Sequence, residues 1–258
     1  MRERKTRLAV LAAAVAVVVF VLGACIFPVA WSPDSKRVVF SIPLADPDKG
    51  MAHGLAMADR LAMVDLEGKM IRDVARVGDS ENESFSPAAW SPDGKWIAYF
   101  RFEPKPAEGA LDPDHPEEDE ATILVSLMLQ EADSGKEGII FQEDVPKDNY
   151  DWGANALYGP QWTADSKALM IRNMSAAQPG LVVLNLQGGI VLDVPLDDEL
   201  GRVTAALSPD GASLAYLRRL PFKDFDWQWE ICVLDIKAGT TRVLGQGVSE
   251  DGPWGRPA

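Results

Sequence analysis

Short runs of β-rich sequence follow one another along most of the chain, and a compact turn precedes many of them. In AWSPDGKWIAYF (89–100), Trp96, Ala98 and Phe100 take every second position after the turn, which is the period of a strand. No long stretch beyond residue 27 shows helical periodicity. Eight tryptophans and 47% hydrophobic residues argue against disorder, and 258 residues can bury a substantial core. The pattern predicts a single all-β domain.

The same turn occurs four times in the same context. Each copy has an apolar anchor, then Ser or Thr, Pro or Ala, Asp, and Gly or Ser, and then a strand. In the copy at 89–100, Pro92 presets φ, Asp93 can hydrogen-bond the local backbone, and Gly94 accepts a positive φ. We therefore expect four β-hairpins with equivalent, buried anchors on their first strands. The anchors are Trp31, Trp90, Trp162 and Leu207, and the turn aspartates are Asp34, Asp93, Asp165 and Asp210.

A second pattern repeats downstream of each turn. It consists of a strand, an Asp or Asn followed by Leu or Ile, a short turn with glycine, and another strand, and it occurs at 61–74, 181–194 and 231–244, with a looser version at 123–141. Each unit therefore holds four strands, a to d. Four-stranded units of this size, enlarged by insertions, are typical of β-propeller blades. The blades are expected at about 28–77, 86–143, 158–196 and 203–246.

The repeat resembles the WD-like propeller repeat of TolB-type proteins, whose blades carry a Trp-Ser-Pro-Asp-Gly turn between the innermost strand and the next. The copies at 30 and 89 match closely, whereas the third has Thr-Ala-Asp-Ser at 163–166 and the fourth replaces the tryptophan by Leu207. The resemblance covers residues 28 to about 254. It implies a propeller fold and a habit of binding other proteins. TolB itself has an α/β domain before its propeller, for which this chain has no room, so its specific partners do not carry over.

The first 24 residues have a different character. A basic start, MRERKTR, precedes an apolar run from Leu8 that ends in Leu-Gly-Ala-Cys at 22–25. This order is typical of an export signal, and its ending resembles the bacterial lipobox, in which the cysteine becomes the lipidated first residue. We expect residues 1–24 to be a signal peptide and Cys25 the lipid attachment point.

The alternative is an uncleaved anchor, because residues 8–27 are long enough to span a bilayer. Both alternatives place the body outside the cytoplasm, since the positive end stays inside. The expected location is the bacterial cell envelope, with the protein attached to the membrane.

The net charge and the motifs that the sequence lacks limit the classes of function that we expect. A net charge of −14 disfavours nucleic acid as a partner. His53 and His115 fall in loop-like sequence, and no Gly-x-Ser-x-Gly, His-Glu-x-x-His, zinc cysteine pair or phosphate loop is present. The acidic segment 111–120 lacks the ligand spacing of a calcium loop. Cys232, without a disulfide partner once Cys25 is modified, is expected to be a buried small hydrophobe. We expect no cofactor and no catalytic residue.

The long segments between strands belong to two kinds of connection. The b–c segments lie at 42–59, 103–121 and 218–228, and the d–a segments at 78–86 and 144–159. In an up-and-down blade these connections share one end, so we expect a single loop-bearing face. Its aromatic residues either pack beneath their own loops or form an exposed patch for a protein or glycan. They are Tyr150, Trp152, Tyr158, Phe222, Phe225 and Trp227.

The number of blades is left open. Four units are complete, and Trp254, in the segment 252–258, falls where a fifth innermost strand is due. Either a longer propeller is cut short, which we favour, or this segment closes the ring by completing the first blade.

The function expected from these features is that of an extracytoplasmic, membrane-tethered propeller that binds a protein or ligand. Two alternatives stay open. One is the propeller part of a truncated hydrolase, similar to prolyl oligopeptidase, or of a lyase. The other is the outer sensor domain of a membrane-anchored regulator.

Overall fold

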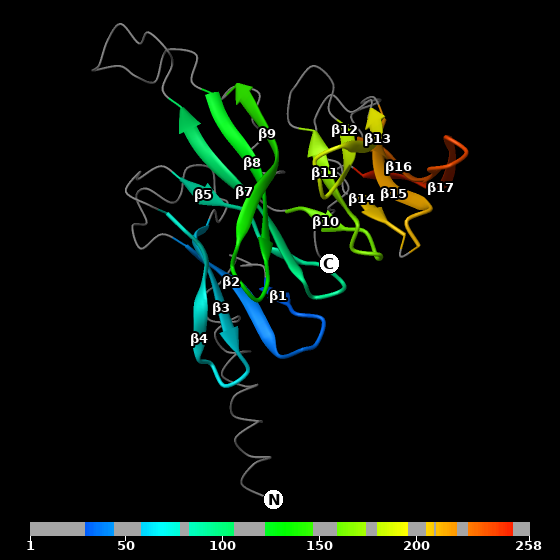
Figure 1. Ribbon diagram of the computed structural model, residues 1–258. Coiled ribbons are helices and arrows are strands. Elements are labelled where there is room, and N and C mark those ends of the chain that lie inside the picture. Colours follow the sequence, from blue (N-terminus) through cyan, green and yellow to red (C-terminus); the bar gives the residue numbers. More distant parts are fainter. Residues whose placement is uncertain are drawn as a thin grey trace, which may run out of the picture.

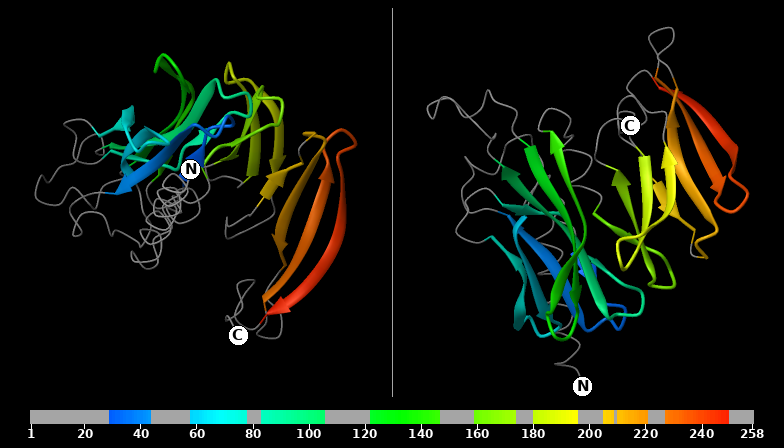
Figure 2. Two further views of the ribbon diagram at one scale, coloured as in Figure 1. Left: turned by 90° about the horizontal axis from the view of Figure 1, so that it is seen from below. Right: turned by 45° about the horizontal axis from the view of Figure 1, so that its top comes forward.

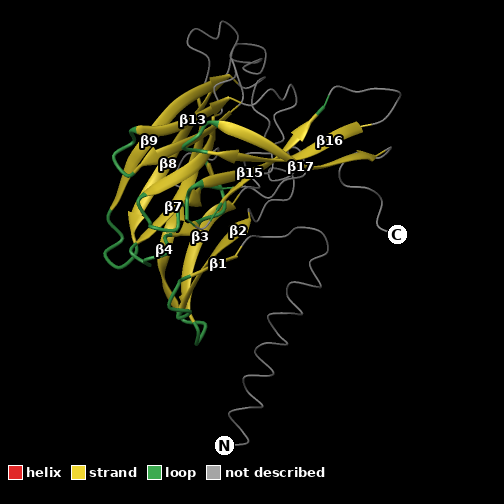
Figure 3. Cartoon of the chain, turned by 90° about the vertical axis from the view of Figure 1, so that its right-hand side faces the viewer, coloured by secondary structure: helices red, strands yellow, loops and turns green. Residues whose placement is uncertain are grey.

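The described part of the chain is built from strands alone. The computed structural model describes residues 29–43, 58–77, 83–105, 122–146, 159–173, 180–195, 205–208, 210–220 and 227–249. They form seventeen strands and no helix (Figures 1 and 3). Curled antiparallel sheets follow one another in chain order along an open arc (Figure 2). The predicted all-β class is confirmed.

Each repeat forms one four-stranded antiparallel blade. Blade 1 contains β1 (Val29–Trp31), β2 (Arg37–Pro43), β3 (Ala58–Asp65) and β4 (Met70–Arg76). Blade 2 contains β6 (Ala89–Trp90), β7 (Trp96–Lys105), β8 (Thr122–Glu131) and β9 (Glu137–Pro146). Blade 3 contains β10 (Gln161–Trp162), β11 (Ala168–Asn173), β12 (Gly180–Asn185) and β13 (Ile190–Pro195). Blade 4 contains β14 (Ala205–Leu207), β15 (Ser213–Arg219), β16 (Trp227–Asp235) and β17 (Thr240–Ser249).

A short additional strand joins the first two blades. β5 (Ser84–Phe85) lies between β4 and β6 in sequence and pairs with both β3 and β7. Phe85 is the shared residue, opposite Ala58 on one side and Arg101 on the other. Blades 1 and 2 therefore form one nine-stranded sheet, whereas blades 3 and 4 are separate four-stranded sheets.

The repeats are in the same register. The four anchors end the first strands and lie opposite the second residues of the next strands, in the pairs Trp31–Val38, Trp90–Ile97, Trp162–Leu169 and Leu207–Leu214. A position in one blade can therefore be compared directly with its equivalent in the others.

The core lies between successive blades. We call the side of a blade toward the preceding blade its leading face and the opposite side its trailing face. In blade 2, Ile97 and Tyr99 are on the leading face and pack with blade 1, whereas Phe100 and Leu127 are on the trailing face and pack with blade 3. A third cluster joins the trailing face of blade 3 to blade 4, where it includes Cys232. Because side chains alternate along a strand, each blade uses both faces.

One expectation about the anchors is wrong. Only Trp90 is buried, at 8% exposed, whereas Trp162 and Leu207 are half-buried and Trp31 is 57% exposed. The reason is that an anchor is covered by the blade before it. The guanidinium carbon of Arg37 in blade 1 lies 4.9 Å from the ring centre of Trp90, and Nε1 of Trp162 donates to the Ala89 carbonyl of blade 2 at 3.0 Å. No blade among the described residues precedes Trp31.

The position of the innermost strand of blade 1 is also settled. Val29–Trp31 pairs with Val38–Phe40, so this strand is not supplied by residues 252–258. That segment itself lies outside the described residues.

Candidate functional site

The strand ends that border the longer segments meet at one end of the blades, which we call the loop end. In blade 2, Lys105 ends β7 opposite Thr122, and Thr122 lies opposite Pro146 at the end of β9. Strand alternation places the corresponding ends of the other blades there too. These ends border residues 44–57, 77–83, 106–121, 147–160, 174–179, 196–204 and 220–226.

The opposite end, which we call the turn end, is closed by short connections. None of the connections there exceeds five residues, as in 32–36, 91–95 and 132–136. The predicted single loop-bearing face is therefore confirmed for the strand ends that the structure describes. The strands extend beyond the predicted limits, since β7 includes Glu103–Lys105 and β9 includes residues 144–146.

The structure describes one of the six aromatic residues predicted for the loop end. Tyr150, Trp152, Tyr158, Phe222 and Phe225 lie outside the described residues. The prediction that Trp227 belongs to a loop is wrong, because Trp227 is the first residue of β16 and pairs with Ser249. Its main chain nevertheless lies at the loop end of blade 4.

Two polar features near the loop end were not singled out from the sequence. The Lys105 ammonium lies 2.7 Å from Oδ1 of Asp144, which links the ends of β7 and β9. Asp59, at the start of β3, has a buried Oδ1 with no hydrogen-bond partner among the described residues. Burial raises the pKa of the Asp59 carboxyl to about 6. An isolated acid in a strand has no sequence signature, so only the packing reveals it.

The turn end carries four copies of one hydrogen-bonded turn. In blade 2, the Ser91 hydroxyl donates to Asp93 at 2.7 Å and accepts from the Trp96 N–H at 2.9 Å. The equivalent hydroxyl–carboxylate pairs are Ser32–Asp34, Thr163–Asp165 and Ser208–Asp210, at 2.6, 2.7 and 2.6 Å. Each aspartate also accepts from the main-chain N–H two residues further on. These are the local bonds that the turn sequence predicts.

The hydrogen bonds change the acidity of the turn aspartates. The Ser32 hydroxyl and then the Lys36 N–H lower the pKa of Asp34 below its usual value, because both stabilise the charged form. Thr163 and Ser208 do the same for the pKa values of Asp165 and Asp210. For Asp93, burial acts in the opposite direction, but the bonds from Ser91 and Lys95 prevail and its pKa is lowered too. The carboxylates thus stay ionised within their own turns.

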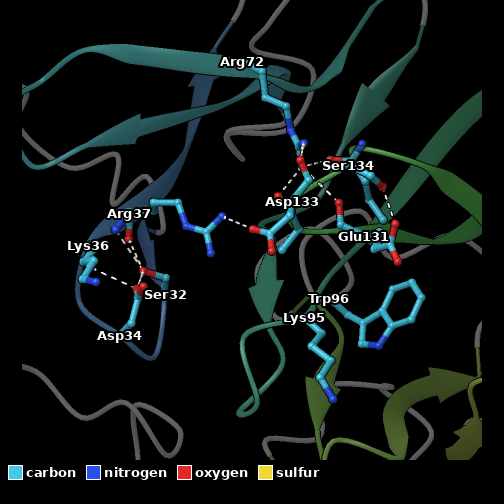
Figure 4. Close-up of polar contacts among 12 residues, drawn as sticks. Ser32, Asp34, Lys36, Arg37, Arg72, Lys95, Trp96, Glu131, Asp133 and Ser134 are labelled. Carbon is cyan, nitrogen blue, oxygen red and sulfur yellow. Dashed lines mark hydrogen bonds and ion pairs between the residues drawn. The ribbon is translucent and has the colours of Figure 1, made fainter.

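A cluster of arginines joins blade 1 to the turn end of blade 2 (Figure 4). Arg72 of β4 donates to the main-chain carbonyls of Glu131, Ala132 and Asp133 at 3.2, 2.8 and 3.2 Å. Its guanidinium also donates to the Gln130 side chain at 3.0 Å. Beside it, Arg37 forms an ion pair with Asp133 at 2.8 Å. We call this set of contacts the arginine latch.

The latch continues into the interior as a chain of side chains. The Gln130 amide donates to the Val74 carbonyl at 2.8 Å and to Glu137 at 3.2 Å. The Tyr99 hydroxyl donates to the same Glu137 oxygen at 2.8 Å. Burial, followed by the bond to Glu137, raises the pKa of Tyr99. These groups bond to one another and to main chain, so their evident role is to hold two blades in register.

The described residues offer little to a metal or to a covalent reaction. They contain no group of three or more His, Cys, Asp or Glu side chains that could hold a metal ion. Cys232 is a buried free cysteine in β16, whereas Cys25, His53, His115 and the acidic segment 111–120 lie outside the described residues. Within the same described ranges, no helix is long and apolar enough to cross a membrane.

Comparison with known proteins supports the fold. No protein-family model and no curated protein matches the chain. Oligogalacturonate lyase in complex with manganese is similar in structure, with a TM-score of 0.52 and 14% identity over 84% of this chain and 52% of the lyase. TolB from Acinetobacter baumannii gives a TM-score of 0.48 with 15% identity, over 84% of this chain and 43% of TolB. A putative TolB from Agrobacterium tumefaciens gives a TM-score of 0.46 with 15% identity, over 87% of this chain and 68% of that protein.

These similarities concern the fold alone. The repeated four-stranded blades, together with the likeness to the lyase, make this chain a β-propeller protein. Two TolB structures are also among its structural neighbours. The chain spans about half the length of the lyase and less than half the length of the Acinetobacter TolB.

Proposed function

We propose that this protein is a membrane-tethered, extracytoplasmic β-propeller that binds a protein partner through its loop end and catalyses no reaction. The observation that carries this proposal is the unequal length of the connections at the two ends of the blades. Because consecutive strands run in opposite directions, the connections of each blade lie alternately at its two ends. This alternation does not require every long connection to lie at the same end, as they do here. Loops presented by a rigid scaffold are a common location of binding residues.

The rest of the described structure fits the role of a scaffold. The turn end is closed by four internally bonded turns, and its latch arginine bonds mainly to main-chain carbonyls. Side chains that bond within their own turns or to main-chain carbonyls stabilise the blades and are not arranged for proton transfer. The aromatic residues proposed for the interaction face are Tyr150, Trp152, Tyr158, Phe222, Phe225 and Trp227.

The proposed tether determines where that face lies. β1 begins at Val29, at the loop end, four residues after Cys25. Four extended residues reach only ~14 Å. With Cys25 lipidated, or with residues 8–27 in the bilayer, the loop end lies close to the membrane. The partner is therefore expected to be another membrane-associated protein.

Photo-cross-linking in cells tests the proposal. A photoreactive residue at Trp152, at the loop end, is expected to form cross-links to a defined membrane-associated protein. The control carries the same residue at Lys95, whose side chain is largely exposed at the turn end, and is expected to form none. Cross-links from Lys95 alone, or equal cross-links from both positions, would contradict the loop end as the binding face.

A further inference from the structure

The trailing face of blade 4 presents apolar side chains that are buried in every other blade. Leu61, Leu127 and Leu181 occupy equivalent positions on the third strands of blades 1 to 3, and all three are buried. Their equivalent in blade 4, Ile231, is 41% exposed. Ala215 likewise is exposed, although its equivalents Val39, Ala98 and Met170 are buried.

The leading face of blade 1 shows the complementary exposure. Trp31 is exposed, and Val38 and Phe40 are only partly buried. In blade 2 the equivalent residues Trp90, Ile97 and Tyr99 are all buried against blade 1. Blade 1 thus has the surface that normally receives a preceding blade, and blade 4 has the surface that normally receives a following one.

Blade 4 also carries an arginine at the position of the latch. Arg72 lies opposite Met63 on the trailing face of blade 1, and Arg242 lies opposite Val233, the equivalent residue of blade 4. Arg242 is exposed. The corresponding turn of blade 1 is acidic, because Asp65 and Glu67 align with Glu131 and Asp133 of the turn that Arg72 holds. The two free faces are therefore both apolar, and they also carry opposite charges at the position of the latch.

We propose that the trailing face of blade 4 docks on the leading face of blade 1 of a second copy of this chain. Arg242 then takes the place of Arg72 and donates to the turn that contains Asp65 and Glu67 in the second copy. Two such contacts close a dimer of eight blades, which is within the usual size of a propeller. Head-to-tail contacts of this kind give a closed ring when the rotation between copies fits.

Several observations favour a second copy as the occupant. Within one chain, blades 1 and 4 lie apart at the two ends of the open arc (Figure 2), so the chain does not bring its own two faces together. The contact needs no new surface, because it repeats the packing already present between blades 1 and 2, including an arginine over an acidic turn. The proposal does not depend on the loop-end function, since neither face belongs to the loop end.

The mass of the purified full chain in detergent tests the proposal. Sedimentation should show a dimer. Arg242→Glu should weaken dimerisation by ~10-fold or more, because it places a third acid beside Asp65 and Glu67 at a contact that needs a cation. The double variant Arg242→Glu with Glu67→Arg should restore dimerisation. The control Lys167→Glu, an equal charge reversal on an exposed turn of blade 3, should dimerise as the wild type does. A monomeric wild type, or undiminished dimerisation of Arg242→Glu, would overturn the proposal.

A disulfide test shows whether blade 4 contacts blade 1 of a second copy or blade 1 of its own chain. With Arg242→Cys and Glu67→Cys in the same chain, oxidation should give a covalent dimer on a non-reducing gel. A disulfide-bonded monomer would mean that blade 4 reaches blade 1 of its own chain and would exclude the second copy. Mixing the two single variants should likewise give a covalent dimer that contains both chains.

Discussion

The fourth residue of each a–b turn has a left-handed backbone. Its φ is 74° at Gly94 and 70° at Gly211, but the same region is occupied by Ser35 at 56° and Ser166 at 61°. A residue with a side chain is disfavoured there by ~1 kcal/mol. The turns could be predicted from the sequence because their chemistry is local. The sequence could not show which of the two serines makes a contact with another blade that offsets this strain.

The two serines are expected to respond differently to glycine. Ser35→Gly should raise the free energy of unfolding by ~0.5–1 kcal/mol, because glycine adopts this φ without strain. Ser166→Gly should gain less or nothing, because the Ser166 hydroxyl accepts from the Asp93 N–H of blade 2 at 3.0 Å. Denaturant unfolding of both variants measures the difference. Equal stabilisation would show that the contact between the two turns contributes nothing.

The raised pKa of Asp59 predicts that the stability of the protein depends on pH. Its folded pKa of about 6 exceeds the usual value of about 3.9, so between these values the folded state binds more protons than the unfolded state. The contribution of Asp59 to stability therefore falls as the pH rises through this window. Asp59→Asn should be more stable than the wild type by ~1 kcal/mol at pH 7, allowing for partial solvent screening, and the gain should vanish near pH 4.

Unfolding of the Asp59→Asn variant at both pH values provides the measurement. The control is Asp73→Asn, which loses an ion pair to Arg60 at 2.5 Å and should not be stabilised at pH 7. A constant difference between wild type and Asp59→Asn at pH 4 and pH 7 would contradict the raised pKa.

At the scale of elements, the strands and turns could be predicted far better than the contacts between blades. Four strands per unit follow from alternation and turn residues close in sequence. The arginine latch joins residues about sixty positions apart, such as Arg72 and Ala132, and no local sequence pattern predicts it. The exposure of Trp31 was missed for the same reason, because it depends on whether another blade precedes blade 1.

The latch is expected to hold the first two blades together. Arg72→Ala removes the donor from three main-chain carbonyls and should lower the free energy of unfolding by ~2–3 kcal/mol. Arg76→Ala, at an exposed position on the same strand, should change it by less than ~0.5 kcal/mol. Thermal or denaturant unfolding measures both. Similar small effects would show that the latch contributes little to stability.

At the scale of the whole molecule, the proposed tether and loop end depend on parts that lie outside the described residues. Cys25 and most of the aromatic residues are among them. The sequence indicates the tether through the basic start, the apolar run and the cysteine. It could not indicate what covers the two free blade faces, because that depends on another molecule or on blades that are not in the printed sequence.

Cys25→Ser tests the attachment to the membrane. The wild type should incorporate radiolabelled palmitate and partition with the membrane, whereas the variant should lose the label and either be released or accumulate as an unprocessed precursor. The mass of the mature protein gives a second readout. Unchanged mass and membrane partition in the variant would rule out lipidation and favour residues 8–27 as an uncleaved anchor.

The central claim is that the blades lie outside the cytoplasm, at the end of an N-terminal tether. Thiol labelling of intact cells with a maleimide that does not cross the cytoplasmic membrane tests this most directly. Lys167→Cys places a thiol on an exposed turn, and the wild type is the control because its Cys232 is buried and the thiol of its Cys25 is expected to carry the lipid. Our account predicts that Lys167→Cys is labelled in intact cells and the wild type is not. Labelling of Lys167→Cys only after the cells are lysed would contradict it.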